Sequence, residues 1–381
     1  MNKLPFFSIL IPTKNRSHIV NYAIQSLLDQ SLKDFEIILM DNSDGNDTAE
    51  AVSMFKDPRL RYYRSGGLNM SENWENALEK TTGQYITVLE DKHAYYSFAL
   101  MTIKELIIRS NAEVVIFDWD HYDSQNSMAY RKKYSRTASF IASDRLIKKY
   151  INKVRDTGTL LPRMINSFAS VDLIKRIKKQ PKVDRFFSEF SPDLCASFFL
   201  LSVADRILIL NDGIGLGGYS NLSNAHRIRS NDDSYNYYGD IDRSKLLNRL
   251  RIKSNLLTYN AVYGDYLFVR NIMGLNLDKY IMSNMIYVKV CLWDVIRLYA
   301  SSRSVKRIFP QLLLIFDFTK KEKFSIFKYL GLFSIMLDVF LVVFLKLYNV
   351  LIASKWPAEN IYVAAMKAGV KPPRIKQIEN Y

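Results

Sequence analysis

The sequence predicts an α/β protein, with a mostly parallel central sheet flanked by helices and followed by a helical C-terminal region. Over the first 120 residues, short apolar runs typical of buried strands alternate with segments of helical periodicity, the pattern that produces parallel sheets. From about residue 245 onward the pattern is helical throughout. The length of 381 residues also suggests more than one unit. We therefore expect two domains, residues 1–235 and 236–381.

The strand and helix signals of the first domain follow one another closely. The expected strands are Phe7–Ile11, Glu36–Met40, Leu60–Tyr63, Tyr85–Leu89 and Val114–Phe117. Helices are expected between them, with Ser17, Asp47 or Thr48, and Ser71 as N-caps. Beyond Asp120 the pattern loosens, until Pro192 opens another helix and Arg206–Leu210 forms another strand. Together, these alternating strands and helices predict the parallel sheet.

A glycine-rich stretch, GIGLGGYSNLSN, covers Gly213–Asn224. Four glycines within six residues do not favour regular structure. We expect either a flexible loop or a tight backbone approach to another group.

Charge is distributed unevenly along the chain. The net charge is +15, but residues 241–381 hold 22 Lys and Arg against 9 Asp and Glu, so nearly all of the excess lies in the C-terminal region. Such asymmetry points to a polyanionic or membrane partner. The two cysteines, Cys195 and Cys291, support neither a disulfide framework nor a cysteine metal site and fit a reducing compartment. The N-terminus is typical of a strand and not of a signal peptide, so we expect no export.

The C-terminal region also contains a membrane-type composition. Gln311–Trp356 is strongly apolar and has basic flanks. Its apolar centre, Tyr329–Leu345, is at the short end for a membrane span and contains Asp338, whose charge would be costly in a bilayer. We expect a helix at the membrane surface; a buried helix of a helical bundle is the alternative.

Polar side chains gather where the predicted strands end. Ligands of open α/β sheets bind outside the carboxyl ends of the strands. Singly, each of these residues has an ordinary interpretation as a helix cap, turn residue or solvated strand end. Together they line one edge of one sheet: Thr13, Asn15 and Arg16; Asp41, Asn42 and Asp44; Glu90, Asp91, Lys92 and His93; and Asp118, Asp120 and His121.

Three segments, SILIPTKNR, EIILMDNSDGNDT and GGLNMSENWENALEKTTGQYITVLED, resemble in order and spacing the family-2 glycosyltransferases of the GT-A fold. The resemblance covers about Phe7–Asn224 and is greatest to the branch that builds bacterial surface glycans. It implies transfer of a sugar from a nucleotide-diphosphate donor to an acceptor hydroxyl of a glycan or lipid-linked glycan, in capsule, O-antigen or related polysaccharide synthesis. It also implies a cytoplasmic enzyme on the cytoplasmic face of the inner membrane.

The resemblance assigns donor-binding roles residue by residue. Pro12 and Thr13 would line the nucleotide pocket, which Asn15 and Arg16 would help to hold. Asp41, followed by Asn42, would accept a hydrogen bond from the base edge, and Asn73 would lie near the base or sugar. The glycine-rich stretch would close over the diphosphate, with Ser223 and His226 reaching phosphate oxygens. For Asn73 the alternative is an ordinary helix residue, and for His226 a structural histidine.

The family places an acidic metal motif after the fourth strand, because Mn²⁺ and Mg²⁺ prefer carboxylate oxygens and neutralise the leaving diphosphate. Here the stretch is Glu90, Asp91, Lys92 and His93, and Lys92 stands where the family has a metal-binding aspartate. Three interpretations stay open. Asp91, with Glu90 or His93, binds a divalent ion; Lys92 replaces the ion as counter-charge; or catalysis has been lost. Asp118-Trp119-Asp120 is a literal Asp-x-Asp motif, but it follows a different strand and is interpreted as an acceptor-side or structural element in preference to a metal site.

Inverting transfer needs a carboxylate that takes the proton of the acceptor hydroxyl. Asp193 is the candidate, since it lies in SPDLCAS, where the resembling family keeps its base. Its apolar neighbours would raise its pKa. The alternative is a first-turn aspartate that only favours the helix dipole.

Two other functions are weighed against a transferase. A nucleic-acid binder is suggested by the pI near 9.5, but the basic residues are interleaved with apolar runs and no nucleic-acid-binding signature is present, so we expect no nucleic-acid partner. A catalytically inactive glycosyltransferase-like protein that binds a nucleotide sugar or acts as a scaffold is suggested by the Glu90–His93 stretch. Turnover of a nucleotide-sugar donor would distinguish an active transferase from this inactive protein.

Overall fold

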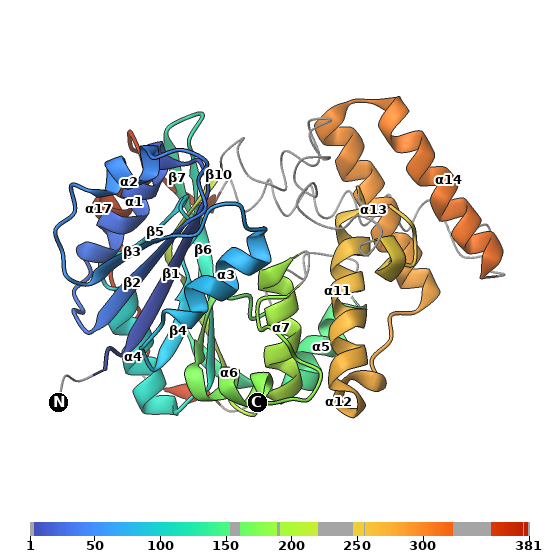
Figure 1. Ribbon diagram of the computed structural model, residues 1–381, viewed down its shortest axis with the longest axis horizontal. Coiled ribbons are helices and arrows are strands. Elements are labelled where there is room, and N and C mark those ends of the chain that lie inside the picture. The colour runs from blue at the N-terminus through green and yellow to red at the C-terminus, as the bar shows by residue number, and fades with distance from the viewer. Residues whose placement is uncertain are drawn as a thin grey trace.

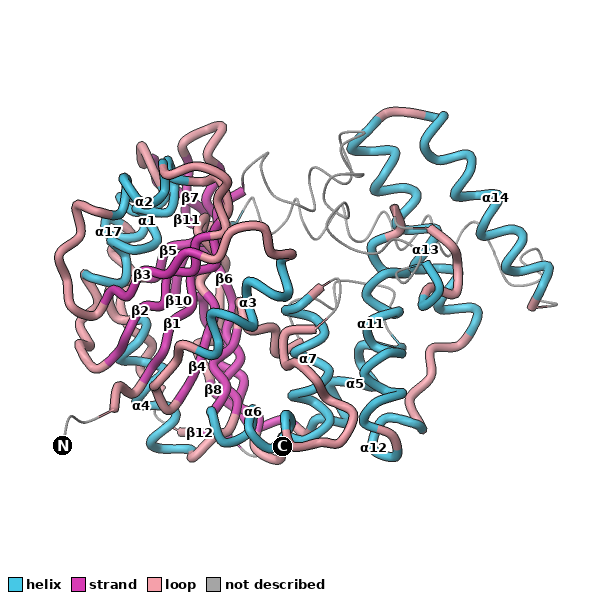
Figure 2. The backbone as a smooth tube through the Cα atoms, in the orientation of Figure 1, coloured by secondary structure: helices cyan, strands magenta, loops and turns pink. Residues whose placement is uncertain are grey.

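The structure is a computed structural model that describes residues 4–152, 161–188, 191–219, 247–254, 256–322, 352–375 and 377–379. It contains a sheet covered on both faces by helices and, beside it, a group of long helices (Figure 1). The strands form one continuous layer, which Figure 2 shows in magenta.

The sheet has the order β12-β8-β10-β6-β9-β4-β1-β2-β3. Its parallel part is built from β4 (Tyr85–Val88), β1 (Phe7–Thr13), β2 (Phe35–Asp41) and β3 (Leu60–Arg64). β9 (Ser167–Ser170) joins this part antiparallel to β4 and β6 (Val114–Asp123), and β10 (Ile207–Tyr219) runs parallel to β6. The remaining strands are β5 (His93–Tyr95), β7 (Met128–Arg131), β8 (Ala138–Ile141), β11 (Ser354–Pro357) and β12 (Ile378–Glu379). The α/β fold with a parallel part at its centre is confirmed, whereas the sheet as a whole is mixed, because β5, β7, β8, β9 and β11 pair antiparallel with their neighbours.

Both faces of the strands are buried, which explains their continuous apolar runs. Along β1, Ile9 and Ile11 pack into one core, whereas Leu10 packs into the other, because successive strand side chains point to opposite faces. The first core contains α1 (Ser17–Leu28) and α4 (Ala99–Ser110), with α2 (Asp47–Val52) packed against α1. The second contains α3 (Met70–Glu79), α5 (Ser143–Asn152), α6 (Val171–Lys178) and α7 (Pro192–Val203).

The starts of three helices differ from the prediction. α3 begins two residues earlier than a cap at Ser71 implies: Asn69 accepts a hydrogen bond from the Glu72 backbone, and the Glu72 side chain accepts one in return, forming a capping box. α1 has Arg16 at its N-cap and α2 has Asn46, in place of the predicted Ser17 and of Asp47 or Thr48, and neither helix has a side-chain cap. The Arg16 side chain is engaged at the end of β4 instead.

The glycine-rich stretch is a strand as far as Tyr219, so the expectation of a flexible loop there is wrong. The other expectation, a close backbone approach, fits. A Cβ added at Gly215 would lie 2.5 Å from the Ala94 carbonyl oxygen and 2.6 Å from the Trp119 ring. β5 and β6 approach β10 so closely that only glycine leaves enough room. Residues 220–224 lie outside the described residues.

The end of the chain returns to the sheet. β11 pairs with β7 and β12 with β8, while α17 (Ile361–Lys367) packs against α1, β5 and β10. Tyr122 Oη donates a hydrogen bond to the Ala358 carbonyl oxygen across this contact. A single helical domain over 236–381 therefore does not describe the chain, since residues 352–375 and 377–379 belong with the first domain.

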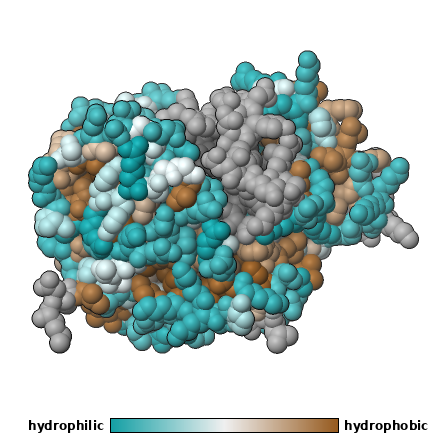
Figure 3. Space-filling model, viewed as in Figure 1, coloured by the Kyte–Doolittle hydropathy of each residue, from teal (hydrophilic) through white to brown (hydrophobic). Residues whose placement is uncertain are grey.

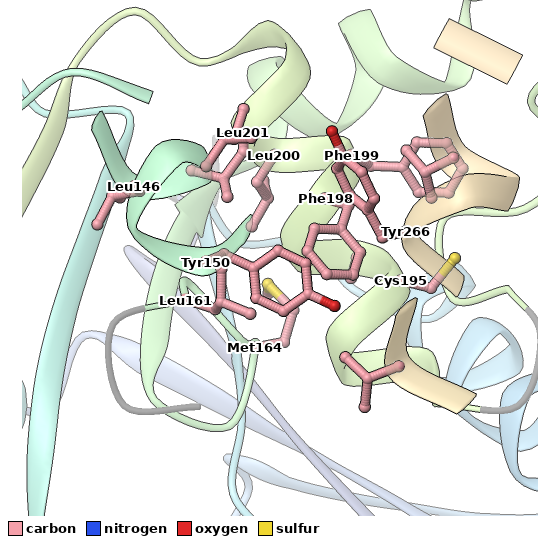
Figure 4. Close-up of a cluster of buried hydrophobic side chains, with 14 of the residues drawn as sticks. Leu146, Tyr150, Leu161, Met164, Cys195, Phe198, Phe199, Leu200, Leu201 and Tyr266 are labelled. Atoms are coloured by element: carbon pink, nitrogen blue, oxygen red, sulfur yellow. The ribbon is translucent and has the colours of Figure 1, made fainter. Parts of the chain in front are cut away.

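The helical part consists of α11 (Thr258–Met273), α12 (Leu275–Asp278), α13 (Asn284–Ser302) and α14 (Val305–Lys321). α11 packs on α7, and their contact contains Tyr266, Tyr150 of α5 and Phe198 of α7 (Figure 4). The same apolar core therefore fixes both α7 and the helical part. Among the described residues, no helix is long and apolar enough to cross a membrane. Tyr329–Leu345 lies outside those residues.

Candidate active site

The polar ends of β1 and β2 are joined by hydrogen bonds. The Asn15 backbone is left-handed, with φ 55°, and its amide donates to Ser43 Oγ at 2.8 Å. The Asn15 side chain donates to Asp44 Oδ2 at 2.7 Å and accepts from the Asp44 amide at 3.0 Å. Pro12 is half-buried just before this turn. The two strand ends therefore form one rigid part of the rim, by which we mean the edge of the sheet where β1, β2 and β4 end.

Asp41 is fully buried and supports this rim from within. Its Oδ1 accepts from the Ser43 amide at 2.9 Å, and its Oδ2 accepts from Tyr62 Oη at 2.8 Å. Burial, followed by the hydrogen bond to Asp41, raises the pKa of Tyr62 to about 12. A base edge would reach Asp41 only if one of these partners moved, so its predicted contact with the base stays a prediction.

Asn42 and Asn73 shape the loop between β3 and α3. Asn42 donates to the Leu68 carbonyl oxygen at 2.6 Å and accepts from the Leu68 amide at 3.1 Å. Asn73 accepts from Ser65 Oγ at 2.7 Å. Both amides hold the loop that borders the rim, a supporting role that residue type alone did not indicate.

Asp91 ties the end of β4 to the end of β1. Its Oδ2 accepts from Thr13 Oγ1 at 2.9 Å, and its Oδ1 accepts from Arg16 Nη1 at 2.9 Å. Only 2% of Asp91 is exposed. Thr13, Arg16 and Asp91 are thus brought together as predicted, and the Arg16 guanidinium neutralises the carboxylate.

Glu90 is also occupied by cationic and polar neighbours. Its Oε1 lies 2.9 Å from Lys92 Nζ, and its Oε2 lies 3.3 Å from His93 Nδ1. Burial opposes ionisation of Glu90, but Lys92, His93 and Arg16 outweigh it and lower the pKa to about 2. Burial lowers the pKa of His93 to about 4, against the attraction of Glu90, so this imidazole is neutral at pH 7.

Asp193 lies in the first turn of α7, after Pro192 at the helix start. Burial raises the pKa of its carboxyl; Arg163 acts in the opposite direction, and Glu90 adds to the increase. Arg163 Nη1 lies 3.7 Å from Asp193 Oδ2. Because the charge of Glu90 acts on the pKa of Asp193, the start of α7 lies near the end of β4.

Arg163 is the site residue that sequence reasoning missed. It lies in the aperiodic segment before β9, where no motif marks it. Besides the Asp193 carboxylate, its positive charge acts on His93 and lowers the pKa of that imidazole after burial and Lys92. Its Nε is buried and makes no hydrogen bond to any residue that the structure describes.

The predicted metal ligands, Asp91 and His93, face different partners. Asp91 is held by Thr13 and Arg16. His93 stacks on Trp119 at 4.7 Å between ring centroids, and its Nε2 lies against the β10 backbone at Gly217. Among the described residues, no three histidine, cysteine, aspartate or glutamate side chains are grouped as they would be to hold a metal ion. In the described part of the chain, the side chains around Asp91 and His93 are therefore not arranged as the ligands of one divalent ion.

Asp120 and Asp212 form a separate cluster, closed by Arg131. Arg131 bonds to both carboxylates, and Tyr96 and Tyr134 donate to Asp120 at 2.8 and 3.0 Å. Asp118 pairs with Lys132 at the surface. The Asp118-Trp119-Asp120 segment is thus a structural element, one of the two interpretations left open for it.

Two predicted donor-binding residues, Ser223 and His226, lie outside the described residues. A cavity of about 500 Å³ lies between α4 and residues 372–375, and none of the predicted site residues lines it. The rim is therefore the candidate site, and it brings together Thr13, Arg16, Glu90, Asp91, Lys92 and Asp193.

Comparison with known proteins gives this rim a context. The model of glycosyl transferase family 2 matches residues 8–171. A Campylobacter jejuni protein named GalNAc(5)-diNAcBac-PP-undecaprenol beta-1,3-glucosyltransferase is 31% identical over 106 residues, 27% of this chain and 34% of that protein. Glycosyltransferase GlyG of Streptococcus pneumoniae is 25% identical over 218 residues, 55% of this chain and 69% of that protein.

Solved structures of S. aureus TarS 1-349 are also similar. The first covers 80% of this chain and 91% of that chain, with a TM-score of 0.47 and 16% identity. The sequence match, by contrast, spans only about a third of the length of the Campylobacter protein. Residues 8–171 span β1 to β9 and with them every rim residue up to His93, so this part of the chain is a glycosyl transferase family 2 domain; it has the α/β architecture of the GT-A fold and is joined to a helical region.

Proposed function

We propose that this chain transfers a sugar from a nucleotide-diphosphate donor to an acceptor hydroxyl, with inversion, in the synthesis of a bacterial surface glycan. The acceptor oxygen attacks the anomeric carbon opposite the diphosphate. The bond from that carbon to the diphosphate oxygen breaks, and the nucleoside diphosphate leaves. Asp193 accepts the hydroxyl proton. Family membership and the names of the two relatives support the reaction class and the kind of product.

The observation that carries the proposal is the setting of Asp193. A general base works best when its pKa lies closer to the working pH than that of an ordinary carboxyl. Burial raises the pKa of Asp193, and Glu90 adds to it, although Arg163 opposes both. The Asp193 side chain is 18% exposed, so an acceptor hydroxyl has access to it.

The donor would lie along the rim between this base and the end of β1. Thr13 and Arg16 are held there by Asp91. Pro12 and Asn15 flank them, and Asp41, Asn42 and Asn73 support the neighbouring turn and loop. Ser223 and His226 would approach the phosphates from the segment after β10.

Substituting Asp193 tests this proposal. We expect Asp193→Asn to lower kcat by about 10²- to 10⁴-fold, the usual contribution of a general base, with little change in nucleoside diphosphate affinity. The measurement is a donor screen for transfer and hydrolysis together with calorimetric binding of the matching nucleoside diphosphates. Asp172→Asn is the matched control, because Asp172 also lies in the first turn of a helix but is exposed.

Two outcomes would contradict the proposal in different ways. Retained turnover in Asp193→Asn would reject this residue as the base. Nucleotide-sugar binding by the wild type without turnover of any donor would instead favour the inactive, scaffolding alternative. That alternative is motivated by the charge-paired Glu90–Lys92 stretch, which replaces an acidic metal motif.

The same proposal places the chain on the cytoplasmic face of the inner membrane. Its acceptor would be a lipid-linked glycan, as the name of the Campylobacter relative suggests. α14 offers a surface for this contact. Its exposed hydrophobic side chains recur at helical spacing, and Figure 3 shows hydrophobic surface over this part of the molecule: Val305, Phe309, Leu312, Leu313 and Phe316. Lys306, Lys320 and Lys321 are exposed on the same helix and would attract anionic headgroups.

Point variants test the membrane contact better than truncation, because a chain cut before α14 would also lose β11, α17 and β12 from the sheet. We expect the double variant Phe309→Glu, Phe316→Glu to lose sedimentation with phosphatidylglycerol vesicles. The control is Met101→Glu, Ile108→Glu, which changes two exposed hydrophobic residues on α4. Equal sedimentation of wild type and the α14 variant would reject this surface.

A further inference from the structure

The strand end that would hold a metal ion in this family is occupied by fixed cations. Each oxygen of Asp91 accepts a hydrogen bond, from Thr13 or from Arg16. Each oxygen of Glu90 faces a nitrogen, of Lys92 or of His93. A divalent ion entering here would have to displace Arg16 or Lys92 from its carboxylate. If both stayed in place, their positive charges would repel the ion. The carboxylates are thus already neutralised by the chain itself.

The remaining candidate ligand is turned away from this position. His93 lies in β5, and β10 runs beside it. Its ring stacks on Trp119, with an angle of 25° between the planes, and its Nε2 lies against the backbone at Gly217. The other ring nitrogen faces Glu90 at 3.3 Å. His93 therefore contributes no ligand that Asp91 could share.

We propose that the diphosphate of the donor is bound and neutralised by Lys92 and Arg163, with Arg16 behind them, in place of a divalent cation. This inference rests on the proposed function, since it assumes a nucleotide-diphosphate donor at the rim. Side-chain cations can stabilise the charge that develops on a leaving diphosphate, provided that they are held in place beforehand. Lys92 follows the end of β4, and Arg163 lies in the segment before β9, which runs beside that strand end: the Val88 amide donates to the Met164 carbonyl oxygen at 2.9 Å.

Both side chains can exchange their present partners for phosphate oxygens. Lys92 keeps 16% of its side chain exposed and pairs with Glu90 through Nζ. Arg163 keeps 25% exposed, and its distance of 3.7 Å to Asp193 is longer than a hydrogen bond. Its planar guanidinium suits bidentate contact with a phosphate. Arg16, in contrast, stays on Asp91 and prevents that buried carboxylate from repelling the diphosphate.

The arrangement also connects the leaving group to the base. Among the residues that the structure describes, Arg163 is the cation paired with Asp193, so a diphosphate that engages Arg163 withdraws positive charge from the Asp193 carboxylate. Donor binding would thereby make that carboxylate a stronger proton acceptor.

Calorimetric binding of nucleoside diphosphates in EDTA and in excess MnCl₂ tests the proposal on the full chain. We expect the wild-type Kd to be the same in both within about twofold, and Lys92→Met to weaken binding by about tenfold or more in both. Lys104→Met is the matched control, because Lys104 of α4 forms a similar ion pair, with 2.6 Å between its Nζ and Asp34 Oδ2. We expect it to leave the Kd unchanged.

A gain of metal dependence sharpens the test. Lys92→Asp places a carboxylate where the family has one, so we expect its nucleoside diphosphate binding to be weak in EDTA and restored at least about tenfold by Mn²⁺. Wild-type binding that is lost in EDTA and restored by Mn²⁺ would overturn the inference alone. Failure of every nucleoside diphosphate to bind, with or without Mn²⁺, would instead reject the proposed donor and both conclusions with it.

Discussion

Two groups of carboxylates and arginines lie on the same sheet and differ in how completely they are paired. In the cluster of Asp120, Asp212 and Arg131, every carboxylate oxygen accepts a hydrogen bond or ion pair, and neither aspartate is more than 1% exposed. At the rim, Arg163 stands 3.7 Å from Asp193, which keeps 18% of its side chain exposed. The first cluster is closed, and the second is open on one side.

The difference separates a structural role from a functional one. A buried charge network is stable only when all of its members are satisfied, and the closed cluster meets this requirement without any ligand. At the rim, burial raises the pKa of Asp193, and Arg163 keeps a buried nitrogen without a hydrogen bond to any described residue. An incompletely paired group of this kind is where substrate and proton transfer are expected.

The largest effect is expected from breaking the closed cluster. Arg131→Met would leave Asp120 and Asp212 buried without their common partner and should lower the free energy of unfolding by about 3–5 kcal/mol. Urea denaturation measures this change. Lys132→Met is the control, because its pair with Asp118 is largely exposed and should contribute only about 0–1 kcal/mol. Similar losses in the two variants would show that the cluster is not closed.

A smaller loss is expected where the glycine-rich strand approaches the closed cluster. A Cβ at Gly213 would lie 2.9 Å from both Asp120 Oδ2 and Tyr134 Oη, closer than real Cβ contacts allow. Gly213→Ala should therefore reduce the free energy of unfolding by about 1–3 kcal/mol. At Gly45 an added Cβ would meet no atom within 4 Å, so Gly45→Ala should be nearly neutral. Thermal unfolding that does not distinguish the two variants would contradict this packing.

The open cluster should respond in the opposite sense. Burial, which Glu90 reinforces and Arg163 opposes, raises the pKa of Asp193. A folded-state pKa above the unfolded value contributes stability at low pH and loses it as pH rises through the folded value. At pH 7 Asp193→Asn should thus raise the free energy of unfolding, by about 0.5–1 kcal/mol, as substitutions at strained active sites often do.

Comparing pH values and clusters checks this assignment. The gain in Asp193→Asn should disappear near pH 3, where the wild-type carboxyl is protonated in both states. Asp212→Asn should be destabilising at pH 7, because Asp212 accepts from Arg131, Arg136 and the Gly213 amide. A loss of stability at pH 7 in both variants would place Asp193 among the structural carboxylates.

The smallest effect concerns the pH profile of transfer. Burial raises the pKa of Asp193 and Arg163 lowers it, so Arg163→Met should raise it further. kcat/KM requires the ionised base, and its fall at acidic pH should therefore begin at a higher pH in this variant than in wild type. Lys178→Met, which removes a partner of Glu75 away from the rim, should leave the position of that fall unchanged.

Much of the sheet and most of the rim could be predicted from the sequence because both depend on short stretches of chain. The strand Phe7–Thr13 is apolar on both faces, and the residues that follow it must emerge at its carboxyl end, whatever else packs around them. The same reasoning placed Asp91 after β4 and Asp193 in the first turn of a helix, and the structure has both there.

What the tertiary structure alone decided are contacts between segments that no local pattern connects. Arg163 comes from an aperiodic segment and meets Asp193, thirty positions later, only because β9 inserts between β4 and β6. Gly213 to Gly218 form a strand because β5 and β6 approach them closely, although glycine itself disfavours strands. The end of the chain returns to β7 and β8 for the same reason: unpaired strand edges accept any extended segment within reach, and chain order does not reveal which one.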